Sequence, residues 1–282
     1  MKFENTKVFN FEGAFRGMRN PKESWDRSDS FFGLIDFKNS EADYEIAHKW
    51  TKIKYPNYKQ LFIDETPESN KLFYEYDQWL IKNGILDIDD YELYGYAAFI
   101  GPNDMKLAQT LIRAGSEHRK FLRQIFVCVD ITAPIYWWKE FDTYKVWTVA
   151  NSTSTMHKLC SKPLTTEDFS MDCLTDISND YPDQTIAETM VNLCENYRKE
   201  FLRTKSKRVW KALIQLLPES FNQTRTVTMN YENLFTIYNH RKNHKLTEWA
   251  NDFIEWEKTL PYANELIFIE KEENWHFWKN MI

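Results

Sequence analysis

The clearest pattern along the chain is a change of hydrophobic period at Asn230. Over residues 226–229, β-branched and apolar residues alternate with polar ones, which is typical of a strand. Asn230 itself is a residue that often caps a helix N-terminus. The positions expected to be buried then recur at helical spacing, at Leu234, Ile237 and Tyr238. The segment therefore predicts a strand that runs directly into a helix extending to Arg241.

Two polar residues share the buried face of this predicted helix. At about 100° per residue, Arg241 falls about 20° from Leu234, and Asn230 falls about 20° from Arg241. A buried arginine without a partner costs about 3–5 kcal/mol. We therefore expect Arg241 to meet an anion, either a carboxylate of the protein or a phosphate of a ligand, because a guanidinium binds both bidentately. Glu232 lies in the first turn, where the helix dipole favours a carboxylate.

Helical spacing also predicts helices elsewhere, over residues 41–54, 68–83, 104–114, 135–146, 185–202, 209–217 and 248–256. Two further strands are expected, over residues 8–11 and 125–132. The second of these rests on alternating apolar positions at Ile125, Val127, Val129 and Ile131. We expect Asp104 to cap its helix and Gly115 to end that helix in the left-handed conformation.

The segments between these elements are predicted to be exposed. Residues 148–157 carry five hydroxyl groups, an amide and an imidazole, and form either a capped turn or a loop that contacts a substrate. Residues 160–184 are acidic and contain prolines, which favours a long surface excursion, and residues 205–211 are expected to be a basic linker. Arg16 and Arg19 belong to a short basic segment before Asn20-Pro21 and are expected in solvent, with contact to an anion as the alternative.

Composition narrows the class of protein. The chain has 282 residues, 43% of them hydrophobic, which suits one large domain or one domain with a substantial insertion. Its net charge is −6 and no block of Lys and Arg runs long, so we expect no general nucleic-acid surface. This composition does not exclude a nucleotide ligand, which needs only one local cationic pocket. The seven glycines form neither a GxGxxG nor a GxxxxGK[ST] motif, which argues against the common dinucleotide and P-loop sites.

Neither a metal site nor a membrane segment is expected. The four cysteines are scattered without a CxxC pair, which indicates free thiols. His240 and His244 are four residues apart, but no acidic HExxH pattern joins them. The N-terminus lacks the apolar region of a signal peptide, and no apolar run reaches transmembrane length. These features predict a cytoplasmic protein.

Two motifs resemble those of the flavin-dependent thymidylate synthases. The run Ala133-Pro134-Ile135, followed by an aromatic and polar helix and a hydroxyl-rich segment, resembles the central motif of that family. The pattern Leu217-Pro218, Asn230, Leu234 and Arg241 resembles the family's LP…N…L…R at the same intervals. The likeness spans residues 104–159 and 209–265. It suggests one domain over residues 1–282, in which residues 160–205 form an insertion.

The resemblance implies an α+β fold, with an antiparallel sheet packed against helices, assembled into a homotetramer whose active sites form where subunits meet. It implies FAD as cofactor, with NADPH and methylenetetrahydrofolate as co-substrates. The partner would be a pyrimidine deoxynucleotide, and the reaction would transfer a one-carbon unit to C5 of that pyrimidine, as in the conversion of dUMP to dTMP.

The same resemblance assigns roles to individual residues. Arg241 falls at a nucleotide-binding arginine and is expected to act in catalysis with Ser154. Further substrate contacts are expected from Glu140, Lys145, Asn151 and Thr153. Cofactor contacts are expected from His118, Lys120, Tyr144, Asn230, Glu232 and His244.

The chain also departs from the family's pattern. Where the family has RHRxxS, residues 143–148 keep one cation, Lys145, and the phosphate-binding arginine before the LP pair is replaced by Ile214. Two alignment frames are open for residues 151–157. These departures leave two alternatives: folate-dependent hydroxymethylation of a pyrimidine nucleotide, or a catalytically inactive nucleotide-binding protein on the same fold.

Overall fold

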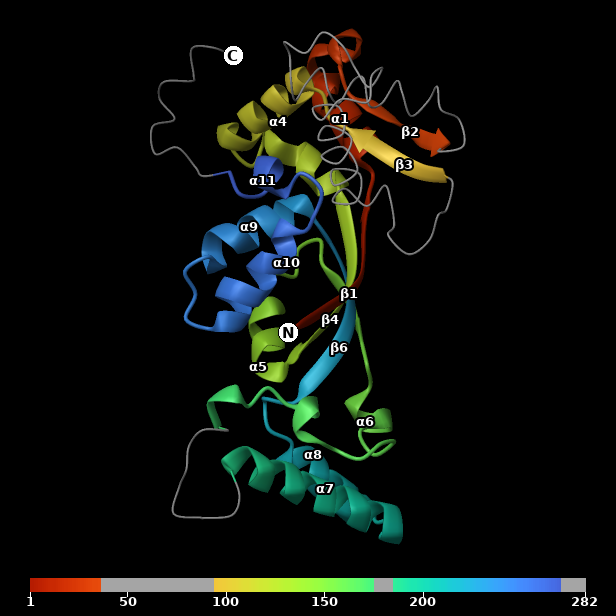
Figure 1. The fold of residues 1–282 in the computed structure, drawn as a ribbon, viewed down its shortest axis with the longest axis vertical. Coiled ribbons are helices and arrows are strands. Elements are labelled where there is room, and N and C mark those ends of the chain that lie inside the picture. The colour runs from red at the N-terminus through yellow and green to blue at the C-terminus, as the bar shows by residue number, and fades with distance from the viewer. Residues whose placement is uncertain (37–93, 175–184, 270–282) are drawn as a thin grey trace, which may run out of the picture. The chain divides into compact units, whose positions relative to one another are not determined.

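The computed structural model describes residues 1–36, 94–174 and 185–269 (Figure 1). The chain divides into two compact units, and each is considered by itself. The first comprises Met1–Lys7 and Cys128–Met229, and the second comprises Val8–Val127 and Asn230–Ile282. The helices predicted over residues 41–54 and 68–83 lie outside the described residues.

The first unit is built on a four-stranded sheet in the order β1-β4-β6-β5. Its strands are β1 (Lys2–Phe9), β4 (Phe126–Pro134), β6 (Asn222–Asn230) and β5 (Val149–Ser152). β5 is an edge strand that pairs antiparallel with β6, so that Asn151 lies opposite Thr226. The sheet and the helices around it confirm the predicted α+β class.

The two faces of the sheet differ in chemistry, as the alternating sequence predicts. One face carries fully buried apolar residues, at Val129, Ile131, Val227 and Met229. On the other face Asp130 accepts hydrogen bonds from Asn5 (2.8 Å) and Thr226 (2.5 Å). The hydroxyls of Thr132 and Thr224 lie 2.7 Å apart on the same polar side. The two central strands β4 and β6 therefore each supply a buried face and a hydrogen-bonding face.

Helix α5 (Ile135–Phe141) is shorter than the predicted 135–146. Its buried rings form an aromatic cluster, in which Trp137 stacks on Phe141 at 5.1 Å and meets Trp138 edge-on at 4.8 Å. The expected loop over 148–157 is instead β5 followed by α6 (Thr155–Lys158). That prediction was wrong because pairing with β6 satisfies the backbone of residues that have little strand propensity of their own.

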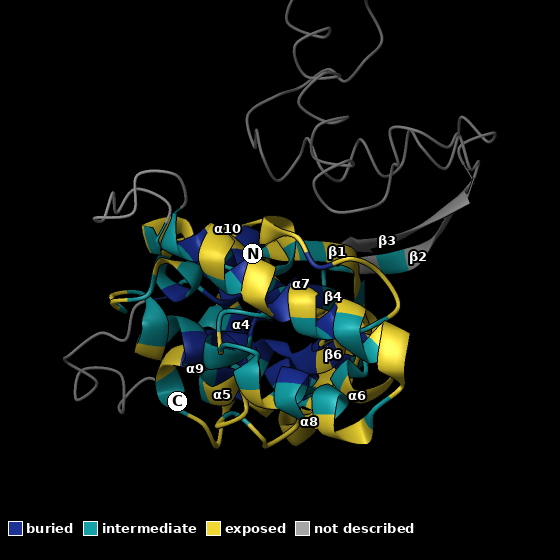
Figure 2. Cartoon of the chain, turned by 90° about the horizontal axis from the view of Figure 1, so that it is seen from below, coloured by how far each residue is buried: buried dark blue, intermediate teal, exposed yellow. Residues whose placement is uncertain are grey.

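A helical pair completes the first unit. Helix α7 (Ile186–Thr204) begins at Thr185, which forms a capping box with Glu188, and packs against α8 (Lys207–Leu216). The basic linker predicted over 205–211 is therefore mostly the first turns of α8. One side of α7 is buried and the other exposed, as Figure 2 shows in dark blue and yellow.

The segment expected as a surface excursion also contributes to this part of the core. Short 3-10 turns, η4 (Thr166–Asp168) and η5 (Asp172–Leu174), follow α6. The buried residues of the resulting cluster come from both the segment and the two helices: Leu159, Leu164, Phe169, Met171, Ala187, Val191, Cys194 and Leu213. The described part of residues 160–184 is therefore not a wholly exposed excursion, because its apolar side chains cover α7 and α8.

The second unit consists mainly of helices. Its elements are α1 (Phe11–Arg19), η1 (Asn20–Lys22), η2 (Trp25–Arg27), β2 (Phe31–Asp36), β3 (Tyr94–Phe99), α4 (Pro102–Ala114), η3 (Arg119–Gln124), α9 (Tyr231–Arg241), the π-helix η6 (Glu248–Phe253), α10 (Ile254–Lys258) and α11 (Ala263–Leu266). β2 and β3 pair antiparallel. The strand predicted over residues 8–11 ends at Phe9, and Phe11 already belongs to α1.

Aromatic packing holds the helices of the second unit together. The ring of Phe11 meets the edge of Tyr231 at 5.7 Å, and Phe15 meets Phe121 at 5.8 Å. The hydroxyl of Tyr231 donates to the carbonyl of Pro261 at 2.7 Å, which satisfies the one polar atom of a fully buried ring. These contacts join α1, η3 and α9 into one core.

Three predictions in and around α4 were wrong. Asp104 does not cap this helix, because the N-cap is Gly101 and the carboxylate of Asp29 accepts the N–H groups of Asn103 and Asp104 (2.8 and 3.0 Å). Arg19, expected in solvent, is buried and bound to Asp104. Gly115 does end the helix with positive φ (113°), but its ψ of 178° is extended, not left-handed helical.

Candidate functional site

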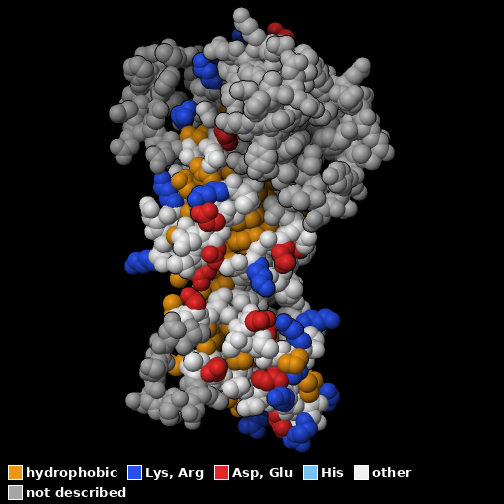
Figure 3. Space-filling view, in the orientation of Figure 1, with side chains coloured by type: hydrophobic (Ala, Val, Ile, Leu, Met, Phe, Trp, Pro, Cys, Tyr) orange, Lys and Arg blue, Asp and Glu red, His pale blue; other side chains and the backbone are white. Residues whose placement is uncertain are grey.

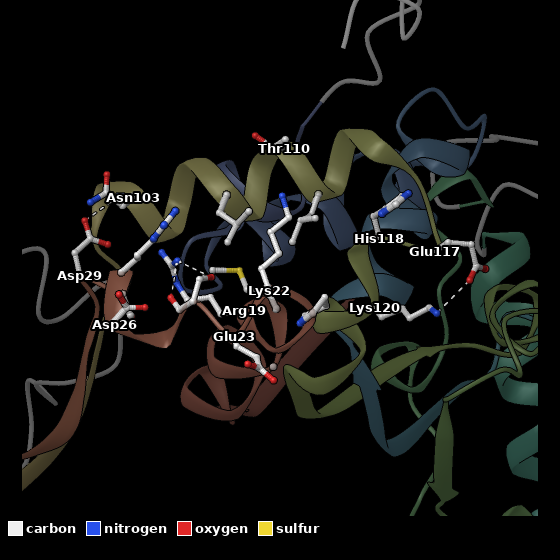
Figure 4. Close-up of a pocket in the computed structure, with 18 residues that line it drawn as sticks. Arg19, Lys22, Glu23, Asp26, Asp29, Asn103, Thr110, Glu117, His118 and Lys120 are labelled. Carbon is white, nitrogen blue, oxygen red and sulfur yellow. Dashed lines mark hydrogen bonds and ion pairs between the residues drawn. The ribbon is translucent and has the colours of Figure 1, made fainter. Parts of the chain in front are cut away.

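Two clefts, one in each unit, collect part of the predicted site residues. The larger, of about 1360 Å³, lies along α4 in the second unit (Figure 4). Asn103 and Asp29 lie at one end of this cleft, Glu117 and His118 lie at the other, and Lys22 extends beneath the helix between them. The cations that line it are Arg19, Lys22, Arg27 and Lys120.

Local sequence explains how His118 and Lys120 reach the cleft. Gly115 stops α4 with a positive φ, and the N–H of His118 then bonds to the carbonyl of Gly115 at 3.0 Å. This turn starts η3, with His118 as its N-cap, and leaves both side chains exposed. Lys120 lies 3.2 Å from Glu117 in a solvated pair, which contributes little to stability.

The second cleft, of about 400 Å³, belongs to the first unit. Thr153 and Ser154 line it from the β5–α6 connection, and Thr132 and Thr224 line it from the polar face of the sheet. Lys158 of α6 also lines it. The Ser154 hydroxyl accepts the N–H of His157 at 3.2 Å and so caps α6. The cleft offers several hydroxyl groups and the ammonium groups of Lys2, Lys158 and Lys162 to a polar ligand, beside the carboxylates of Glu4, Glu167 and Asp168.

Other predicted substrate and cofactor residues of the first unit line neither cleft. These are Glu140, Tyr144, Lys145 and Asn151. Lys145 and Asn151 are exposed, and Asn151 lies on the edge strand. Thr148 donates a hydrogen bond to the carbonyl of Tyr144 at 2.6 Å, which shapes the turn that leads into β5.

Asn230 lies where the sequence predicts, at the junction of β6 and α9. Its side-chain oxygen accepts the N–H of Asn233 at 3.0 Å, and Asn233 returns the bond to the N–H of Asn230 at 3.2 Å. The residue is fully buried, and within the described part of the chain its Nδ2 has no hydrogen-bond acceptor. A buried donor without an acceptor costs about 1–3 kcal/mol, so this amide is suited to receive an acceptor atom from a ligand.

Arg241 does not lie as the helical spacing predicts. It is half-buried, not enclosed, and its guanidinium lies 4.9 Å from the centre of the Trp249 ring. Arg241 is the last residue of α9, so its long side chain extends beyond the buried stripe, which ends at Ile237. An aromatic face therefore provides part of its surroundings.

Glu232 and His244 already make specific contacts. The two carboxylate oxygens of Glu232 accept hydrogen bonds from Nε of Arg119 (2.9 and 2.8 Å), and Arg119 also lies 4.5 Å from the centre of the Phe235 ring. This ion pair joins η3 to α9. His244 accepts the N–H of Leu246 through Nδ1 at 3.2 Å.

The structure also shows a cation that the sequence reasoning missed. Arg225 lies opposite Ser152 in the sheet, 4.3 Å from the centre of the Trp138 ring, and donates to Asp142 at 2.9 Å. It directly precedes the alternating run 226–229, which predicts only a strand, and it carries no local signal of its own. The clustering of Arg225 with Trp138 depends on the pairing of distant segments.

Burial and hydrogen bonding change the acidity of several groups. Hydrogen bonds from Thr226 and Asn5 lower the pKa of Asp130, and hydrogen bonds from Arg198 lower that of Glu195. Burial raises the pKa of Glu257 well above its ordinary value, and neither oxygen of this carboxyl has a hydrogen-bond partner in the described residues. Glu257 is therefore held neutral around its usual titration range.

Neither a metal cluster nor a membrane span is found in the described ranges 1–36, 94–174 and 185–269. No group of three or more His, Cys, Asp and Glu side chains there is arranged to hold a metal ion. No helix in the same ranges is both long and apolar enough to cross a bilayer.

The fold defines the described chain as an α+β protein with a four-stranded sheet and surrounding helices. It is structurally similar to thymidylate synthase X from Helicobacter pylori in a crystal structure with FAD and dUMP, at 14% identity and a TM-score of 0.48, over 62% of this chain and 85% of that chain. A second crystal structure of that flavin-dependent thymidylate synthase with FAD and dUMP is 17% identical, with a TM-score of 0.46, over 59% and 83% of the two chains. No protein-family model matches the sequence. A search of curated proteins finds no match.

Proposed function

We propose that this protein is a flavin- and folate-dependent enzyme that transfers a one-carbon unit to C5 of a pyrimidine deoxynucleotide, converting dUMP to dTMP. Two sequence motifs support the proposal, and both coincide with strand-to-helix junctions. Pro134 ends β4 and precedes α5, and Asn230 ends β6 and caps α9. The motifs therefore have the structural context in which a ligand can meet a helix N-terminus.

The buried amide of Asn230 is the observation on which the proposal depends. The resemblance puts Asn230 at an asparagine that contacts flavin, and the described chain gives its Nδ2 no acceptor. The side-chain oxygen is held by the N–H of Asn233, which fixes the NH₂ group in the opposite direction. A carbonyl or ring nitrogen of a flavin would satisfy this donor, so the residue fits the cofactor.

The cleft along α4 suits the phosphate end of the same cofactor. His118 and Lys120 line it, together with Lys22 and Arg27. These side chains would bind the diphosphate of FAD through charge-assisted hydrogen bonds. When bound, the flavin would supply the redox and one-carbon chemistry, with NADPH and methylenetetrahydrofolate as co-substrates, and the chain would supply orientation and electrostatics.

The hydroxyl-lined cleft suits the sugar and phosphate of the nucleotide. Thr153 and Ser154 would hold hydroxyl or phosphate oxygens, and Lys158 would neutralise the phosphate. Glu140, Tyr144, Lys145, Asn151 and Arg241 remain proposed ligand contacts.

A homotetramer would complete these sites, since the family's active sites form between subunits. Large exposed apolar side chains on and around the edge strand β5 support such an assembly; their exposed fractions are 71% for Val146, 65% for Trp147, 67% for Val149 and 53% for Met156.

A catalytically inactive nucleotide-binding protein is the second candidate. Several predicted ligand contacts are already used inside the chain: Ser154 caps α6, and Glu232 binds Arg119. Lys145 is the one cation kept from the family's three in residues 143–148, and it is exposed. These features favour binding without turnover.

The test combines binding and turnover. A ligand present at about 100 times its Kd should add about 2.7 kcal/mol to the free energy of unfolding, so thermal-shift measurements with FAD and with dUMP report binding. Lys158→Gln should weaken dUMP binding roughly tenfold, whereas the control Lys7→Gln, also exposed in the first unit, should not. Absence of FAD binding would contradict the proposal.

Product analysis then separates the candidates. Incubation with dUMP, methylenetetrahydrofolate and NADPH should yield a methylated nucleotide by mass spectrometry. A hydroxymethylated product formed without NADPH would favour the hydroxymethylase alternative. Binding of both ligands without any product would favour the inactive alternative.

A further inference from the structure

A basic surface lies where α7 ends and α8 begins, outside both clefts. Its cations are Lys199, Arg203, Lys205, Lys207, Arg208 and Lys211, and all six are exposed. Figure 3 shows blue side chains gathered around this end of the helical pair. We name these six residues the basic turn.

The fold concentrates these charges on one side of α8. At about 100° per residue, Lys207 and Lys211 lie within about 40° of each other, and Arg208 follows about 60° further round. The opposite side of the helix is apolar, because Leu213 is fully buried in the cluster with α7, whereas the partly buried Ile214 lies about 20° from Lys207. The cationic side is therefore held outward by the packing of the apolar side.

The charges of the basic turn are only partly neutralised. Lys199 lies 3.7 Å from Glu195, and Arg203 binds Glu200 at 2.7 Å. In the described part of the chain, no carboxylate lies within ion-pair distance of the four remaining cations: Lys205, Lys207, Arg208 and Lys211. The surface thus keeps an excess of positive charge on a protein whose net charge is −6.

The side chains of the basic turn favour one class of anionic partner over a membrane surface or a protein. Insertion into a membrane surface needs apolar side chains among the cations, whereas the exposed side of α8 presents Lys207, Arg208, Lys211 and Gln215. A stable protein interface needs a fully buried apolar centre, and the apolar side chains beside these cations are few: the exposed Leu202 and the half-buried Trp210 and Ile214. Trp210 is half-buried and lies about 60° from Lys207 around the helix, beside the cationic side. A row of cations next to an aromatic ring suits a nucleic-acid strand.

We propose that the basic turn binds the phosphate backbone of single-stranded nucleic acid. Lys205, Lys207, Arg208 and Lys211 bind phosphates, and Trp210 offers a ring on which a base can stack. This surface differs from the expectation, based on net charge and the absence of a long basic block, that the chain has no nucleic-acid partner. Four of the six cations already belong to the basic segment 205–211 of the sequence, and the formation of α8 turns three of them, Lys207, Arg208 and Lys211, to one side of a helix.

The test is a titration of the full-length protein into a fluorescein-labelled single-stranded oligonucleotide of mixed sequence, followed by anisotropy at several salt concentrations. Each neutralised phosphate changes the slope of log K against log salt by about 0.7 for single strands. Reversing three cations together (Lys207→Glu, Arg208→Glu, Lys211→Glu) should therefore weaken binding more than tenfold and reduce that slope by about 2.

The matched control carries the same change of charge elsewhere. Lys106→Glu, Arg113→Glu and Lys245→Glu alter three exposed cations of the second unit, and this triple variant should bind the oligonucleotide like the native chain. An equal loss in both triple variants would overturn the proposal, because net charge alone would then explain binding. It would also be overturned by absence of oligonucleotide binding at low salt, or by equal or tighter binding to phosphatidylserine vesicles at matched phosphate concentration.

Discussion

Arg19 and Asp104 form a buried ion pair in which Nε of the arginine lies 2.5 Å from the carboxylate, although 85 residues separate them in sequence. The other carboxylate oxygen accepts the hydroxyls of Ser28 and Ser30. The pair therefore ties the end of α1 to the start of α4, and Arg19 also lines the larger cleft.

Breaking this pair from one side should destabilise the protein strongly. Asp104→Asn leaves a buried guanidinium without its counter-charge, and we expect a loss of about 3–5 kcal/mol in the free energy of unfolding, measured with urea. Replacing both partners (Arg19→Met with Asp104→Leu) should recover most of that loss, because no buried charge is left unpaired. The exposed Asp26→Asn serves as control. If the double variant lost as much free energy of unfolding as Asp104→Asn, an unpaired buried charge would not be the cause of the loss.

Glu257 should make stability depend on pH. Burial raises its pKa in the folded state above the unfolded value near 4.5, so its contribution is fully present below that value and is lost as pH rises through the folded pKa. Glu257→Gln removes the titration, and we expect it to raise Tm relative to the native chain more at pH 8 than at pH 5. Each kcal/mol gained should raise Tm by about 2–4 °C.

The control for this prediction is Glu255→Gln, two residues earlier in α10 and exposed. It should change Tm by a similar small amount at both pH values, because a solvated ion pair with Lys258 contributes little. If Glu257→Gln shifted Tm equally at pH 5 and pH 8, the buried carboxyl would not be the titrating group.

Asn230→Ser separates the capping of α9 by the side-chain oxygen from the proposed contact of the NH₂ group with FAD. Serine keeps an oxygen that can cap α9, so the free energy of unfolding should change little. The variant lacks the NH₂ group, and FAD binding should weaken by about 1 kcal/mol, or roughly fivefold, in a fluorescence titration. Asn243→Ser, at an exposed position, is the matched control. Unchanged FAD affinity would remove the main support for the proposed cofactor site.

Trp147 should report the proposed assembly. Its side chain is 65% exposed, and its φ of 66° lies in the left-handed region that favours glycine. Trp147→Gly should therefore leave the monomer as stable or slightly more stable while removing an apolar contact. We expect sedimentation to show a smaller species at low protein concentration. Leu193→Lys, also exposed but on α7, should not change the sedimentation.

The sequence by itself determined the elements whose residues follow one clear period. The alternation in residues 125–131 fixed the buried face of β4, and the change of period at Asn230 fixed the β6–α9 junction and its cap, because these signals depend on neighbouring residues along the chain. It also predicted α7 from Thr185 onward, where cap, spacing and propensity agree.

Only the tertiary structure decided the partners of the charged and polar side chains. The local sequence predicts a solvated Arg19 and a helix-capping Asp104, and it predicts only a strand position for Arg225. The free energy of burying a charge depends on whether an opposite charge from a distant segment lies beside it. The local sequence does not contain that information. The same reason explains why the hydroxyl-rich sequence predicts a loop where the structure has β5: the backbone of this strand is satisfied by β6, more than 70 residues later in the chain.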